Sequence, residues 1–87
     1  MNFEAMKERL FPMLVTGDRV GARAIINEAL ESGTSSEELT HECYWPMLDM
    51  INLMYREDKM ASLAHHYATR LLRSLVDQAQ ANYEQKA

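Results

Sequence analysis

Apolar residues recur every three or four positions along most of this chain, which is the spacing of amphipathic α-helices. The first segment carries them at Phe3, Met6, Leu10, Met13 and Leu14. Pro12 lies inside this segment and is expected to bend or interrupt the helix, because proline lacks a backbone N–H. Alternating β-branched runs bounded by turn residues, which would predict strands, are absent from the sequence. The pattern therefore predicts an all-α fold.

The first two helical segments meet at a short break. Gly17 can supply the end of the first helix, and Asp18 can cap the start of the second. The second helix is predicted over residues 19–32, with Gly33 ending it. Its expected apolar stripe is Val20, Ala24, Ile25 and Ala29.

A clear start signal opens the third helix. Ser35, followed three residues later by Glu38, has the form of a capping box, in which each side chain binds the other residue's backbone N–H. The helix is predicted to run from there through Tyr55. Pro46 lies about halfway along it and should kink the helix or split it in two.

The fourth helix is the longest and follows a charged connector at residues 56–59. It is predicted from about Ala61 to Tyr83, and residues 84–87 form a polar tail or the start of a linker. Its expected buried face is Ala64, Ala68, Leu71, Leu72, Leu75 and Ala79. Short connections make sequential helices antiparallel, so the sequence predicts one up-down four-helix bundle over residues 1–83.

Composition narrows the function classes. The chain has 87 residues and a formal charge of −4, which argues against a nucleic-acid-binding footprint. A single cysteine excludes an internal disulfide and suits a reducing compartment. The charged N-terminal segment is not expected to be a secretory signal, and no apolar run in the sequence is long enough to span a bilayer. These observations predict a cytoplasmic protein that lies outside the membrane.

Three polar residues stand out near the start of the fourth helix. Ser62, His65 and His66 are separated by three and four residues, so we expect them to project from one side of that helix. Imidazoles there could transfer a proton, bind a metal or make a hydrogen bond, or they could simply form a solvated edge of the helix.

Zinc and autonomous catalysis are both disfavoured. The potential ligands, His41, Cys43, Asp58, His65 and His66, lack the paired spacing of structural zinc sites. A lone helical cysteine is more often a buried apolar residue than a nucleophile. No nucleophile elbow or phosphate-binding glycine loop is present, so we expect no catalysis by the chain alone.

Methionines are frequent, with seven in the chain. Met47, Met50 and Met54 are three and four residues apart and can share one helix face. They could fill the core, or they could form an adaptable surface for a partner helix or a second copy of the chain.

The run from Leu53 to Thr69 resembles the helical cap of cobalamin-binding modules found in methionine synthases, corrinoid proteins and light-sensing cobalamin-dependent regulators. The photoreceptor members carry a Trp-x₉-Glu-His signature, and this chain has Tyr55, nine intervening residues, and then His65 and His66. The position of Pro46, the polar lead-in at residues 35–39 and the run at 68–72 also look like that family. The resemblance is strongest over residues 18–79.

The resemblance implies a site at the junction of the third and fourth helices, over the upper face of methyl- or adenosylcobalamin. Tyr55 would stand where a Trp or Phe shields the cobalt–carbon bond, and Ser62 would occupy the next contact position. His65 replaces a Glu that contacts the adenosyl ribose in the photoreceptors. His66 would be an upper cobalt ligand, as a histidine is in the photoreceptors after photolysis.

The lower half of such a module carries an Asp-x-His-x-x-Gly motif on a Rossmann-type domain. This sequence contains no Asp-x-His and no βαβ pattern. The resemblance therefore implies a cap that works with a Rossmann-type domain in cis or in trans, in a sensory or regulatory protein or a corrinoid carrier. The alternative is a helical interaction or dimerisation module with no cofactor.

Overall fold

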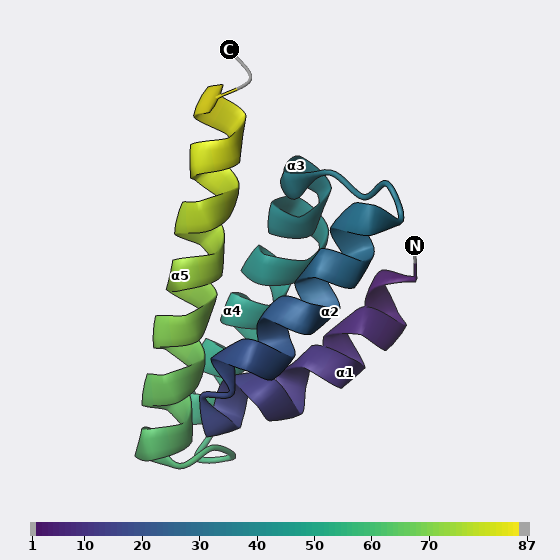
Figure 1. The fold of residues 1–87 in the computed structure, drawn as a ribbon. Coiled ribbons are helices and arrows are strands. Elements are labelled where there is room, and N and C mark those ends of the chain that lie inside the picture. Colours follow the sequence, from purple (N-terminus) through teal and green to yellow (C-terminus); the bar gives the residue numbers. More distant parts are fainter. Residues whose placement is uncertain (1, 86–87) are drawn as a thin grey trace.

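The computed structural model describes residues 2–85, and for residues 82–85 it describes the backbone alone. Its elements are α1 (Phe3–Thr16), α2 (Arg19–Glu31), α3 (Ser36–Leu39), the π-helical turn η1 (Thr40–Tyr44), α4 (Trp45–Arg56) and α5 (Ser62–Gln85). Because α3, η1 and α4 follow one another without a break, these elements make four helical rods (Figure 1). The described residues contain no strand, which confirms the all-α class.

The helix ends lie where the capping signals place them. Gly17 adopts a left-handed conformation with φ of 72° and ends α1, and the Asp18 carboxylate accepts a 2.9 Å hydrogen bond from the Gly21 N–H at the start of α2. The Ser35–Glu38 capping box forms in both directions, with distances of 3.1 and 3.2 Å. Helix α5 continues to Gln85, two residues beyond its predicted end. Residues 86–87 of the predicted tail lie outside the described residues.

Pro12 does not interrupt α1. The helix continues through it to Thr16, whose hydroxyl donates a 2.8 Å hydrogen bond to the Pro12 carbonyl.

A kink or split at Pro46 is not confirmed, because α3, η1 and α4 are continuous through it. Instead, the five residues of η1 before α4 take the wider π-helical form, and the Trp45 N–H bonds the Thr40 carbonyl. A proline ring clashes with the carbonyl four residues earlier in a regular α-helix, so the wider turn makes room for the ring.

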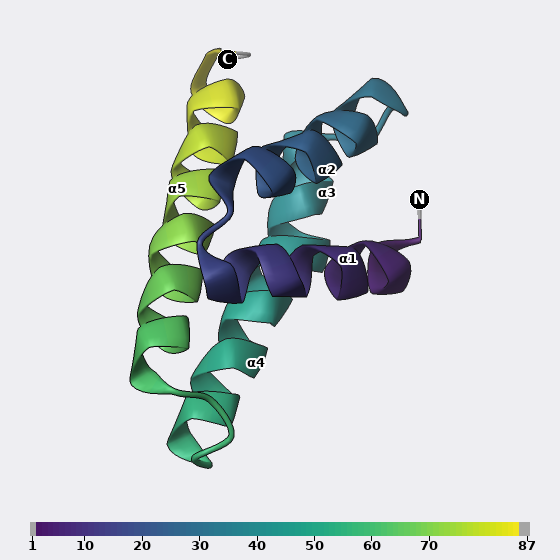
Figure 2. The same ribbon diagram turned by 60° about the horizontal axis from the view of Figure 1, so that its bottom comes forward.

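The regular up-down arrangement is also not confirmed. Helix α5 lies alongside the rod formed by α3, η1 and α4, whereas α1 runs across these helices (Figure 2). Helix α2 packs on α1.

The core lies where α5 meets α1 and the α3–η1–α4 rod. Its largest fully buried side chains are Tyr44, Leu10, Leu14, Leu39, Met47, Ile51, Leu72, Thr40 and Cys43. The predicted face of α5 is buried from Ala68 to Ala79, with Ala64 half-buried. In α2, Ile25 and Ala29 of the predicted stripe are buried, but the prediction is wrong for Val20, which is 81% exposed, and for Ala24, which is exposed. Ala22 and Ile26 are buried in addition.

Truncating the centre of this core should destabilise the fold. Leu72 is 0% exposed, so Leu72→Ala should lower the free energy of unfolding by roughly 2–5 kcal/mol through lost burial and a residual cavity. Urea denaturation followed by circular dichroism measures the change. Leu63→Ala, on the same helix but 60% exposed, should change stability by only about 0.5 kcal/mol or less. Equal losses in the two variants would contradict this packing.

Candidate functional site

The junction between α4 and α5 brings the last turns of one helix beside the first turns of the other. Helix α4 ends at Arg56, and the Lys59 N–H bonds the Met54 carbonyl at 2.8 Å. Asp58 takes a left-handed conformation with φ of 59°, which turns the chain back. Helix α5 then begins at Ser62, and this short reversal sets which side chains of the two helices meet.

Tyr55 and His65 stack across this junction. Their ring centroids are 4.2 Å apart and their planes differ by 14°. The Tyr55 hydroxyl lies 3.4 Å from the Ser62 hydroxyl, so a second α5 side chain contacts the same tyrosine. The structure therefore brings together Tyr55, Ser62 and His65, three of the four residues singled out from the sequence.

Asn52 fixes the orientation of the histidine. Its side-chain oxygen lies 2.9 Å from Nε2 of His65. An amide oxygen only accepts hydrogen bonds, so Nε2 must donate, and in the neutral ring Nδ1 is then the acceptor. The imidazole is thus held by a stack on its face and a hydrogen bond at its edge.

These groups border an open hollow of about 610 Å³. Asp49, Asn52, Leu53, Tyr55, Arg56 and His65 line it. Leu53 is 48% exposed and Tyr55 40% exposed, so the hollow offers an accessible apolar and aromatic surface. A flat ligand could lie against this surface.

His66 lies elsewhere. It lines a second hollow, of about 340 Å³, with residues from the α1–α2 turn and from α5. Its ring is 6.1 Å from that of Tyr67. His65 and His66 therefore border different hollows, and the expectation that Ser62, His65 and His66 serve one surface is not confirmed for His66.

Sequence reasoning missed Asn52 and Leu53 as site residues. The available signal was spacing: Asn52 is three residues before Tyr55, which places both on one face of α4. The hydrogen bond to His65 depends on how α4 and α5 dock, and helical spacing within one helix does not carry that information.

The other chemical candidates are structural. Cys43 is 0% exposed, and its Sγ lies 4.0 Å from Sδ of Met47. His41 is exposed, and its ring packs edge-on against Trp45 at 4.8 Å. Among residues 2–81, whose side chains are described, no three His, Cys, Asp or Glu gather as a metal site.

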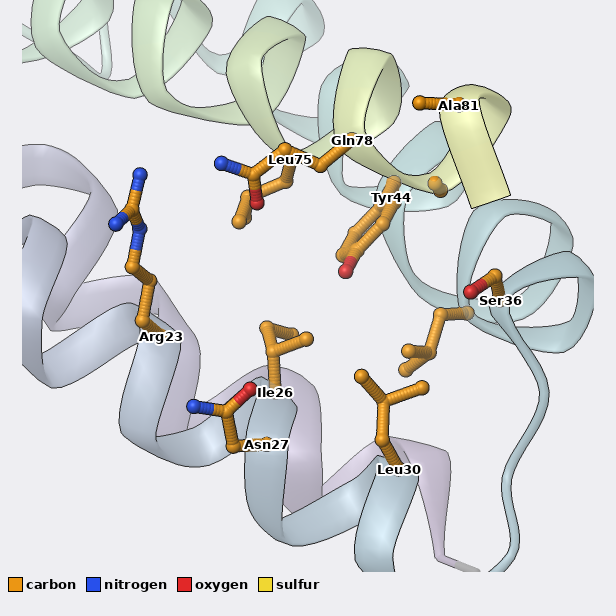
Figure 3. A pocket seen from close by; sticks show the side chains of 11 residues that line it. Arg23, Ile26, Asn27, Leu30, Ser36, Tyr44, Leu75, Gln78 and Ala81 are labelled. Atoms are coloured by element: carbon orange, nitrogen blue, oxygen red, sulfur yellow. The ribbon is translucent and has the colours of Figure 1, made fainter. Parts of the chain in front are cut away.

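A further cleft, of about 480 Å³, opens between α2, the α3–η1 segment and the C-terminal half of α5. Ile26, Leu30, Tyr44 and Leu75 point into it, while Arg23, Asn27 and Gln78 lie toward one end (Figure 3). None of these residues lines the hollow beside Tyr55.

A family model described as the B12 binding domain matches residues 6–80, so the chain belongs to that family, the helical cap of cobalamin-binding proteins. No curated protein and no solved structure matched the chain in the other two comparisons. In the part of the chain that the structure describes, no helix is long and apolar enough to cross a membrane.

Burial raises the pKa of the Cys43 thiol from its ordinary 9.0 to about 11, with the nearby Lys7 ammonium opposing a smaller part of the shift. The unfolded chain therefore loses this proton at lower pH than the folded chain. We expect the free energy of unfolding to fall as pH rises from 9 toward 11. Denaturation of wild type and Cys43→Ala across this range measures the effect. A Cys43→Ala curve as steep as that of the wild type would contradict it.

Proposed function

We propose that this domain covers the upper axial face of a corrinoid held by a Rossmann-type domain, in cis or in trans. Membership of the B12 binding domain family supports corrinoid binding. The observation that carries the proposal is the stacked Tyr55–His65 pair at the α4–α5 junction, beside an open hollow. The domain binds and shields in this proposal, and catalysis belongs to its partners.

The arrangement suits shielding because its flat surface is already ordered. Ser62 contacts the Tyr55 hydroxyl and Asn52 holds the His65 ring, so little side-chain freedom remains to be lost on binding. Leu53 adds exposed apolar area next to the rings. When a corrinoid is bound, such a surface would exclude water from its upper face and would limit the escape of an upper axial group.

The cobalt-ligand role of His66 is a separate part of the proposal. A neutral imidazole is a good donor to cobalt. His66 lies in a hollow apart from Tyr55, so shielding and ligation are tested by different variants. Both a sensory or regulatory role and a corrinoid-carrier role use a covered upper face, with either a methyl or an adenosyl group beneath it.

Photolysis of methyl- and adenosylcobalamin tests the shielding. With a cobalamin-loaded Rossmann-type domain present, the wild-type chain should slow photolysis severalfold, because a covered fragment recombines with cobalt. Tyr55→Leu should remove most of this protection. Trp45→Leu is the matched control, since Trp45 has a similar exposed fraction, 45% against 40%, and does not line the Tyr55 hollow.

Equal photolysis rates with and without the wild-type chain would contradict the shielding proposal. An equal loss of protection in Tyr55→Leu and Trp45→Leu would also contradict it.

Titration of hydroxocobalamin tests ligation in the same mixture. Absorption spectra that are unchanged by the wild-type chain and by His66→Ala would rule out cobalt contact by His66. A change abolished by His65→Ala and retained in His66→Ala would assign the contact to His65.

A second candidate function is that of a helical interaction or dimerisation module. It is favoured by a methionine-rich hollow between α1 and α4. Met50 is 41% exposed and, with Phe11, Pro46 and Met54, lines a hollow of about 450 Å³ between α1 and α4. Met47 also borders it, but that residue is 1% exposed and belongs to the core. The hollow is mostly apolar, with charged residues at its α1 side.

This second function predicts reversible association. Sedimentation equilibrium should show an apparent molecular mass that rises with protein concentration and does not change when cobalamin is added. Met50→Lys should abolish the association by placing a charge in the apolar hollow, whereas Leu63→Lys, exposed on α5, should not. A monomer at all concentrations would eliminate self-association.

A further inference from the structure

Arginines gather on the side where the start of α2 faces the middle of α5. Arg19, Arg70 and Arg73 line one open hollow of about 590 Å³, together with Ser74, Asp77, Gln78 and Ala81. Arg23, one turn after Arg19 on α2, lies in the adjacent cleft, which shares Gln78 and Ala81 with this hollow. Cationic side chains from two helices thus converge on one surface.

These guanidinium groups have no ionic partners among residues 2–81. The salt bridges there join Lys7 to Glu4 and Arg9 to Glu28. The four arginines Arg19, Arg23, Arg70 and Arg73, set against the single carboxylate Asp77, give the patch a formal charge of +3. The whole chain has a formal charge of −4, so the residues outside the patch carry a formal charge of −7. The net charge therefore conceals a strongly cationic face.

Arginine suits one class of ligand especially well. Its planar guanidinium donates paired hydrogen bonds to phosphate oxygens and keeps its charge at all ordinary pH values. The Ser74 hydroxyl and the Gln78 amide lie in the same hollow and supply further donors. The hollow is thus equipped for a compact anion with several negative charges, as in a chain of phosphates.

The adjoining hollow adds an aromatic surface. It shares Arg19 and Arg70 with the arginine hollow and is also lined by Tyr67 and Gly17. Tyr67 is 42% exposed, and Gly17 lies so close that a Cβ added there would be 3.5 Å from its ring. An accessible ring beside arginines that have no ionic partner within residues 2–81 is a combination that suits a base and its phosphates.

We propose that Arg19, Arg70 and Arg73 bind the phosphates of a free nucleoside polyphosphate whose base stacks on Tyr67. The charge distribution favours a free nucleotide over a nucleic-acid strand. A long polyanion would extend past the patch and meet the −7 remainder of the chain, whereas a nucleotide stays within the two hollows. This site is separate from the Tyr55 hollow and does not rest on shielding by Tyr55, but His66, the proposed cobalt ligand, lines the same hollow as Tyr67.

Calorimetric titration of the full chain with magnesium-free ATP, ADP, AMP and adenosine tests the site. Affinity should fall in that order and should weaken as salt is raised. Arg70→Gln with Arg73→Gln should weaken ATP binding about tenfold or more, and Arg19→Gln on the other helix should weaken it in the same direction. Arg9→Gln removes the same single charge as Arg19→Gln, but outside both hollows, and should leave binding unchanged.

Inorganic tripolyphosphate and a single-stranded oligonucleotide identify the ligand class. Tyr67→Leu should weaken ATP but not tripolyphosphate. The absence of saturable ATP binding at millimolar concentration overturns the proposal, as does a loss of ATP affinity in Arg9→Gln equal to that in Arg19→Gln. An ATP affinity that is unchanged by Tyr67→Leu overturns base stacking. An oligonucleotide that displaces ATP at equal phosphate concentration overturns the choice of a free nucleotide. Circular dichroism of each variant separates lost binding from lost folding.

Discussion

The apolar stripe of α5 is the constraint on which the structure depends. Helix α5 packs on α1 and on all three parts of the α3–η1–α4 rod, and Leu72 is completely buried at this meeting point. Helix α2 instead gains its burial through α1. Because α5 is held along most of its inner face, its two edges keep fixed orientations. Both candidate sites lie on those edges.

Adjacent residues of α5 serve different surfaces for this reason. His65 turns toward α4, where Asn52 and Tyr55 hold its ring, while His66 turns toward the α1–α2 turn. Neighbouring helical residues point about 100° apart. Because α5 is held in one orientation, its neighbouring residues contribute to different surfaces. The Tyr55 face is aromatic and the opposite edge is rich in arginine, so one rigid helix presents two chemically distinct surfaces.

Local signals in the sequence predicted more of the fold than of its contacts. The Ser35–Glu38 box and the Gly17–Asp18 break could be located because capping involves residues only a few positions apart. In α2, Ile25 and Ala29 are buried as predicted, but Val20 and Ile26 are both apolar, and only packing against other helices decides which of these two is buried. The Tyr55–His65 spacing indicated the right junction. The part played by Asn52, and the different position of His66, depend on how two helices pack.

The π-helical turn η1 has a consequence for insertions and deletions during evolution. Removing one residue from Thr40–Tyr44 would replace the wide turn by α-helical winding and turn α4 by about 100° about its own axis relative to α3, while α5 stays packed on α1 and α3. Tyr55 would then no longer face His65, although neither residue had changed. A single-residue gap in this turn, eleven positions before Tyr55, could thus separate relatives that keep the aromatic stack from relatives that have lost it.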